Sequence, residues 1–128
     1  MHLDLITLQK IEDRMANKRF VTRTIKGAEW HFYLESASVY KRKHGSDSAA
    51  ITYIKEREVY FNRLEFDTNC VRHELFHIYV AESNTNSSPD FTKDDMEDLS
   101  AEIVGEFGPL IVHEADFIHN KLIVLNKK

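Results

Sequence analysis

Residues 70–79 read Cys-Val-Arg-His-Glu-Leu-Phe-His-Ile-Tyr, and they decide how the rest of this 128-residue chain is interpreted. Apolar side chains recur through this run at the three- and four-residue spacing of a helix, and no glycine or proline interrupts it. We therefore expect a helix over residues 69–82, with Asp67 or Thr68 as its N-cap. Its apolar side chains should pack in the core.

Two histidines lie four positions apart on this expected helix, at His73 and His77. The spacing places both imidazoles on one face, one turn apart, where they can share one zinc ion. Glu74 follows the first histidine, and in a His-Glu-x-x-His pattern its carboxylate acts as general base toward a zinc-activated water. The competing interpretation is a buried helix whose histidines only hydrogen-bond to their neighbours. We favour the metal, because two bare histidines in an apolar helix would be costly to bury.

A catalytic zinc site also needs a third protein ligand, and an acidic stretch further along the chain offers candidates. Its carboxylates are Asp94, Asp95, Glu97, Asp98, Glu102 and Glu106. Most residues of such a stretch form a solvated face. Ala101 and Gly105 are small and four positions apart, so this segment can approach the first helix closely. Asp98 and Glu102 are one turn apart, so one could bind zinc while the other orients a histidine.

Strand signals precede the helix. Residues 20–25 alternate apolar and polar side chains and are rich in β-branched residues, and residues 30–34 follow a turn at Gly27. Residues 41–48 are expected to form a loop. Residues 51–54 and 59–61 indicate a hairpin, with a charged turn at residues 55–58.

Further helices are expected on both sides of these elements. Residues 3–15 carry apolar side chains at helical spacing, which predicts an N-terminal helix. Residues 83–91 are expected to form a loop, followed by a helix from Thr92 that Gly108-Pro109 ends, and a last helix at residues 110–125. The fold class is therefore α+β: an N-terminal helix, a short antiparallel or mixed sheet, a site-bearing helix and C-terminal helices in one domain over residues 1–128.

Composition excludes several classes of protein. Hydrophobic residues make up 42% of the chain and charged residues 30%, which is typical of a globular domain and not of a disordered one. The net charge of -4 argues against a dedicated nucleic-acid binder. Cys70 is the one cysteine, so no internal disulfide can form. Because neither a signal peptide nor a membrane span is recognisable, we expect a cytoplasmic protein.

Residues 70–79 resemble the zinc-binding signature of the zincin metallopeptidases. Residues 58–62 followed by 71–77 are similar to the edge strand and active-site helix of small phage-encoded and SprT-like metallopeptidases. Residues 98–102, Asp-Leu-Ser-Ala-Glu, resemble the gluzincin element Glu-x-x-Ala-Asp/Asn, also found in repressor-cleaving phage-associated peptidases. The resemblance covers about residues 45–109 and implies a small zincin-like domain of phage or prophage type.

The resemblance also implies roles for individual residues. In this register Asp98 stands where the family has a glutamate as third zinc ligand, and its shorter side chain must reach the metal. Glu97 is the alternative ligand, since a slight rotation of the helix would present it instead. Glu102 is placed to orient a ligand, and is itself a third option for the metal. The resemblance further implies an edge strand near residues 59–62, against which an extended peptide could pair.

The function predicted from these features is a zinc-dependent metallopeptidase that hydrolyses peptide bonds in a protein or peptide substrate. His73, His77 and Asp98, or Glu97 in its place, would bind Zn²⁺, and Glu74 would move the proton. The alternative is a non-catalytic zinc-containing binding or regulatory module of phage origin. The presence of Glu74 favours the enzyme, because a purely structural zinc site does not require it.

Weaker candidates remain for stabilising the oxyanion of the reaction. They are His31, His44, Tyr60, Tyr79, His113 and His119, and residues of these types are more often surface or packing residues. Cys70 lies one turn before His73 and is expected to be a small core residue and not a metal ligand.

Overall fold

Four strands form one mixed sheet in the computed structural model, which describes the backbone of residues 20–83 and 93–127 and the side chains of 20–83 and 102–127. The strands are β1 (Phe20–Ile25), β2 (Ala28–Glu35), β3 (Ala50–Tyr53) and β4 (Glu58–Asn62), in the spatial order β1-β2-β4-β3. β1 pairs with β2 and β3 with β4 in antiparallel fashion, whereas β2 and β4 are parallel. The predicted α+β class is confirmed, and so is the hairpin expected from residues 51–54 and 59–61.

The turn between β1 and β2 shows why this hairpin forms. Lys26 and Gly27 both have positive φ, at 50° and 84°. A two-residue hairpin turn of this kind follows the natural twist of the strands, and glycine adopts such a conformation without steric cost.

The sheet order corrects one expectation. The strand near residues 59–62 was expected at an edge, but β4 lies between β2 and β3. β3 pairs with β4 on the side away from β2, and β3 therefore forms the edge of the described sheet. Strand order depends on pairing between distant segments, which a local sequence pattern does not specify.

Helix α2 (Ala37–His44) also differs from expectation, because a loop was predicted from residue 41. The Ser36 side chain accepts a hydrogen bond from the Val39 N–H and caps the start of the helix. Gly45 ends it in the left-handed conformation, with φ of 67° and its N–H bonded to the Lys41 carbonyl. Tyr40 is fully buried and anchors this helix, whose last four residues are basic, to the sheet.

Helix α3 (Thr68–Ser83) confirms the helix predicted over residues 69–82. The Asp67 carboxylate accepts a 2.7 Å hydrogen bond from the Cys70 N–H. Of the two expected candidates, Asp67 and not Thr68 is therefore the N-cap. Val71, Glu74, Leu75 and Ile78 form the buried face at helical spacing. A short 3-10 helix, η1 (Arg63–Glu65), joins β4 to this segment.

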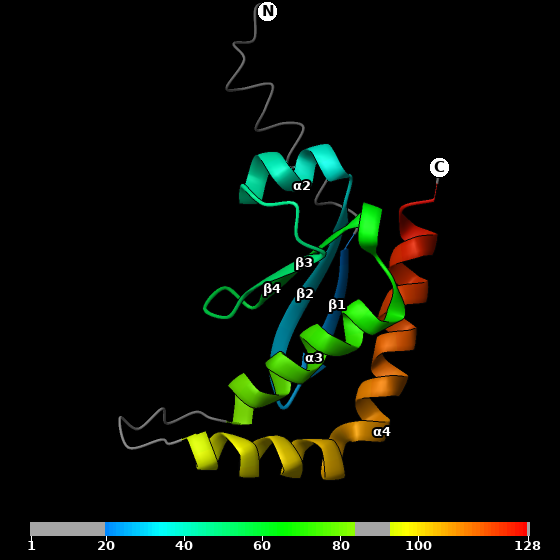
Figure 1. The fold of residues 1–128 in the computed structure, drawn as a ribbon. Helices are drawn as coiled ribbons and strands as arrows, with labels where there is room; N and C mark the ends of the chain where they lie inside the picture. The colour runs from blue at the N-terminus through cyan, green and yellow to red at the C-terminus, as the bar shows by residue number, and fades with distance from the viewer. Residues whose placement is uncertain (1–19, 84–92, 128) are drawn as a thin grey trace, which may run out of the picture.

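Helix α4 (Lys93–Leu125) is one element where two were expected. Figure 1 shows it as a long helix that bends sharply partway along, and Pro109 lies inside it. Proline removes one helical hydrogen bond and crowds the preceding turn, which bends a helix without necessarily ending it. Ile103 before the proline and Ile111 and Ile118 after it are buried in the same core, so packing holds both arms in helical form.

The two faces of the sheet are covered unequally. Figure 1 shows α3 and α4 on one side of the sheet and α2 on the other. The main core lies between the sheet and the α3–α4 pair and contains Trp30, Phe32, Val59, Phe61 and Leu75, all fully buried. A smaller cluster of Tyr33, Tyr40 and Tyr60 lies under α2.

Some expected elements lie outside the described residues, namely the helix at residues 3–15 and the loop at 84–91 with Thr92. Among the described helices, none has the length and apolar character that crossing a membrane requires.

Candidate functional site

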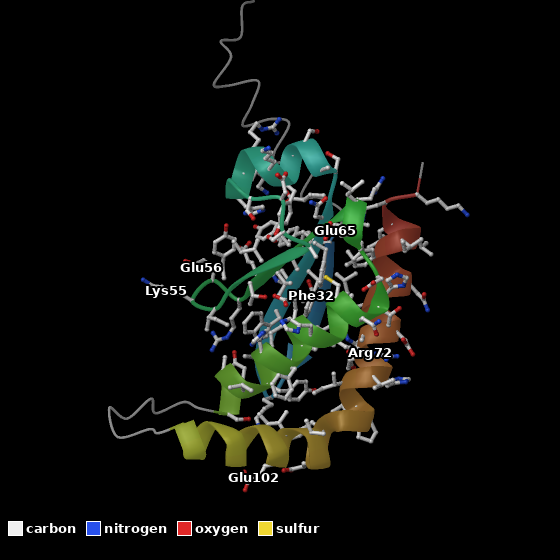
Figure 2. The ribbon with its side chains drawn as sticks, in the orientation of Figure 1. Phe32, Lys55, Glu56, Glu65, Arg72 and Glu102 are labelled. Carbon is white, nitrogen blue, oxygen red and sulfur yellow. The ribbon has the colours of Figure 1, made fainter. Side chains whose placement is uncertain are left out.

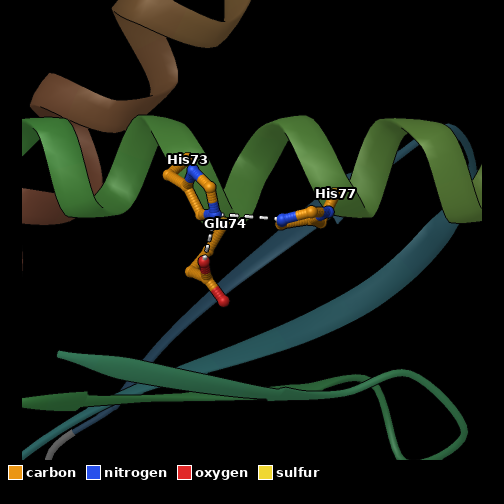
Figure 3. Close-up of side chains that lie close together, drawn as sticks. All are labelled: His73, Glu74 and His77. Carbon is orange, nitrogen blue, oxygen red and sulfur yellow. Dashed lines mark hydrogen bonds and ion pairs between the residues drawn. The ribbon is translucent and has the colours of Figure 1, made fainter. Parts of the chain in front are cut away.

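Helix α3 brings His73, Glu74 and His77 together, as the sequence predicts. His73 and His77 are exposed, and the His73 side chain is 70% exposed. The expectation that the two histidines would be buried in an apolar helix is therefore wrong, and the cost of burying them does not favour a metal. Glu74 belongs to the inner face and is 9% exposed. Figure 3 shows the imidazoles side by side along the helix and the Glu74 carboxylate pointing toward the strands.

The two imidazoles have their Nε2 atoms 3.0 Å apart and their ring centroids 4.6 Å apart, with the rings nearly perpendicular. Two nitrogens bound to one tetrahedral zinc ion at about 2.0–2.1 Å are about 3.3 Å apart. The donor atoms therefore fit a shared metal ion with a displacement of a few tenths of an ångström. A hydrogen bond between the two rings is the other arrangement that this distance allows.

Glu74 lies close to this pair. One carboxylate oxygen, Oε2, is 3.8 Å from Nε2 of His73. The other, Oε1, accepts a 2.8 Å hydrogen bond from the Thr52 hydroxyl on β3. One potential ligand atom from each of His73, Glu74 and His77 lies within 4.8 Å of the others, and no other described side chain joins this group.

A hollow of about 270 Å³ opens beside Glu74. It is lined by Ala49 just before β3, by Ala50 at its start, and by Cys70, His73 and Glu74 on α3. The small side chains of the two alanines leave this space open, so that another molecule can reach the carboxylate from solvent.

The three residues expected as options for the third ligand all lie on α4. Asp98 and Glu97 lie in the first part of α4, but their side chains fall outside the described part of the chain. Glu102 is described and is exposed, and Figure 2 shows it on the side of α4 that points away from α3. It lines a different hollow with Lys26 and Ser83. The structure therefore does not bring Glu102 to the two histidines.

Three of the candidates for oxyanion stabilisation lie on the wrong side of the sheet. Tyr60 stacks on Tyr33 under α2, and His44 lies between Glu35 and Tyr53 on the same face. His31 is on that face too, beside Phe20. His31 and Tyr60 alternate with core residues along β2 and β4 and therefore face away from α3, whereas His44 is on α2, which covers that opposite face.

The other three candidates are on the helical side but apart from the cluster. Tyr79 is buried against Phe107, and burial raises the pKa of its hydroxyl above the ordinary value. His113 is exposed on α4, and His119 stacks on Phe66. None of these belongs to the group formed by the two histidines and Glu74.

Cys70 packs against the main core, as expected, and also lines the hollow. Burial raises the pKa of its thiol to about 12, with the nearby Glu74 carboxylate adding to the effect. The thiol is therefore neutral at physiological pH and is a poor nucleophile and a poor metal ligand, because both roles require the thiolate.

We expect iodoacetamide to alkylate Cys70 at pH 8 at least about 100-fold more slowly in the folded chain than in the chain unfolded in urea. A thiol with a pKa near 12 is ionised to about one part in ten thousand at this pH, against about a quarter for an ordinary cysteine. Mass spectrometry of timed samples measures both rates. Equal rates would contradict the buried thiol. The raised pKa further predicts that the folded rate is still increasing with pH at about pH 9, where an ordinary cysteine is mostly ionised.

Thr52 was missed by sequence analysis. A threonine in a strand is ordinary, and the sequence alone does not say which face of which strand will lie opposite Glu74. The contact could be anticipated only once the pairing of β3 with β4 placed Thr52 beside Val59, a core residue.

Comparisons of this chain with protein-family models, with curated proteins and with solved structures found no match.

Proposed function

We propose that this protein is a zinc-dependent metallopeptidase that hydrolyses peptide bonds in a protein or peptide substrate. One observation carries the proposal: two exposed imidazoles with Nε2 atoms 3.0 Å apart lie next to a carboxylate that is almost fully buried. A metal ion and a general base are the two components that hydrolysis by a metallopeptidase needs, and the cluster offers donors for the first and a residue for the second.

His73 and His77 would hold the metal, together with Asp98 or, in its place, Glu97. Zinc, when bound, lowers the pKa of a coordinated water toward neutrality and polarises the carbonyl of the scissile bond. Glu74 takes the proton from the attacking water and returns it to the leaving amine. The hollow at Ala49 and Ala50 gives the substrate a route to Glu74.

Charge and cysteine content suggest the setting. The net charge of -4 supports a protein or peptide partner over a nucleic acid, since a nucleic-acid binder is usually basic. A single cysteine, held as a neutral thiol, suits the reducing cytoplasm, where we place the activity.

A second candidate is a non-catalytic module that binds a partner through zinc. The exposure of the His73 side chain, at 70%, favours it, because a metal on an open surface can accept a ligand from another protein. Glu74 favours the peptidase instead, since a carboxylate beside the two donors has no purpose in a site that only links two proteins.

Cleavage of a proteome-derived peptide library separates the two candidates. The zinc-loaded chain is incubated with the library, and new peptide termini are identified by mass spectrometry. We expect cleavage products that disappear with a zinc chelator and return when zinc is restored. A chain that binds zinc and cleaves no peptide would contradict the peptidase and support the binding module.

A further inference from the structure

Thr52, on strand β3, donates a 2.8 Å hydrogen bond to the Glu74 carboxylate from another element of the fold. We propose that Thr52 positions the general base: its hydroxyl holds one oxygen of the Glu74 carboxylate and thereby directs the other oxygen toward the side where His73 lies. This inference rests on the proposed function.

The register of the sheet places Thr52 for this role. Thr52 pairs with Val59 of β4, whose side chain is fully buried in the main core beneath α3. Its neighbours Ile51 and Tyr53 pack instead with the tyrosine cluster under α2. Side chains alternate along a strand, so Thr52 faces α3 while both neighbours face α2.

The two oxygens of Glu74 have different surroundings. Oε1 is 2.8 Å from the Thr52 hydroxyl, which must donate to an ionised carboxylate because that group only accepts. Oε2 is 3.8 Å from Nε2 of His73, too far for a direct hydrogen bond. Thr52 thus occupies one oxygen and leaves the other for proton transfer.

The hydrogen bond from Thr52 restricts the rotation of the Glu74 carboxylate. A free glutamate carboxylate turns about its last torsion, and a general base works only while it remains within hydrogen-bond reach of the proton it takes. The hydrogen bond comes from a strand that is itself bonded to β4 and hence fixed to the sheet. The supporting residue is therefore held in place by the sheet, as a positioning residue should be.

The test compares Thr52→Val with Thr52→Ser. Valine keeps the branched shape but removes the donor, whereas serine keeps the hydroxyl. For the library peptide that the wild type cleaves fastest, we expect Thr52→Val to lower kcat by about 10- to 100-fold with KM within about twofold, the range typical for residues that support a metal site. Thr52→Ser should restore most of kcat.

A second readout does not depend on activity. In the zinc-free chain, the ¹³C signal of the Glu74 side-chain carboxyl is expected to shift in Thr52→Val and to stay near its wild-type position in Thr52→Ser. Thermal unfolding of each variant establishes that it folds. A purely structural role for Thr52 would change the unfolding temperature but leave kcat and the carboxyl signal of the folded chain unchanged.

Several outcomes would overturn the inference. If Thr52→Val keeps kcat while Glu74→Gln loses it, the peptidase stands and Thr52 is not its positioning residue. If Thr52→Val loses bound zinc, Thr52 serves the metal and not the base. If Glu74→Gln cleaves as well as the wild type, the proposed function itself fails, and the inference fails with it.

Discussion

Replacing Glu74 with glutamine is expected to lower kcat/KM by about 10²- to 10⁴-fold while zinc remains at about one ion per chain. Glutamine has the shape of glutamate, and its amide oxygen can still accept the hydrogen bond from Thr52. It cannot take a proton from water, so it removes the base and leaves the surrounding structure in place. Kinetics on the peptide identified from the library, with zinc measured by elemental analysis, give both quantities.

Glu82→Gln is the matched control for this variant. Glu82 is also on α3, and its replacement by glutamine removes the same negative charge. Its carboxylate accepts hydrogen bonds from Trp30 and Arg57, away from the histidines. We expect this control to keep the wild-type kcat/KM and zinc content. Full activity in Glu74→Gln, or equal losses in the two variants, would contradict the role of Glu74 as base.

The cluster on α3 was predictable because its geometry is local. Four residues on a helix return the chain to the same face, so the sequence alone places His73 and His77 together and Glu74 beside them. The Asp67 cap is local in the same sense, since the carboxylate bonds to a backbone N–H three residues later. Such features require no knowledge of how distant segments pack.

The errors arose where local signals compete with packing. Helix α2 has few apolar residues, so its charged end resembles a loop, and burial of Tyr40 supplies the missing stabilisation. Gly108-Pro109 is a sequence that commonly ends a helix, but core contacts on both sides of the proline keep α4 continuous. In both cases tertiary packing outweighs a local preference.

The parts of the site that come from other elements could not be predicted individually. Thr52 reaches Glu74 only because β3 pairs with β4, and a third ligand from α4 would depend on how α4 approaches α3. Helical spacing alone makes Asp98 and Glu102 equal candidates, and only the structure shows that Glu102 points away. Metal-binding measurements on variants are therefore needed to identify ligands that come from two different helices.

Loss of zinc in His77→Ala is the second large effect that we expect. The Nε2 atoms of His73 and His77 are 3.0 Å apart, and removing one imidazole should weaken zinc binding by more than about 100-fold. Mutation of residues that only support a metal ligand already lowers metal affinity by about 10- to 100-fold. Competition with a fluorescent zinc indicator measures the affinity. His113→Ala, which removes an exposed histidine of α4, is the control and should bind zinc as the wild type does.

The same assay assigns the third ligand. We expect Asp98→Ala to lose zinc affinity to a similar extent, and Glu97→Ala to retain it. The opposite result would make Glu97 the ligand, as a small rotation of the first turns of α4 would allow. If both variants retain zinc, the ligand is neither residue, and two exposed imidazoles would have to complete their site with a partner. Wild-type affinity in His77→Ala would contradict the metal site altogether, because the chain would then be binding zinc somewhere other than the His73–His77 pair.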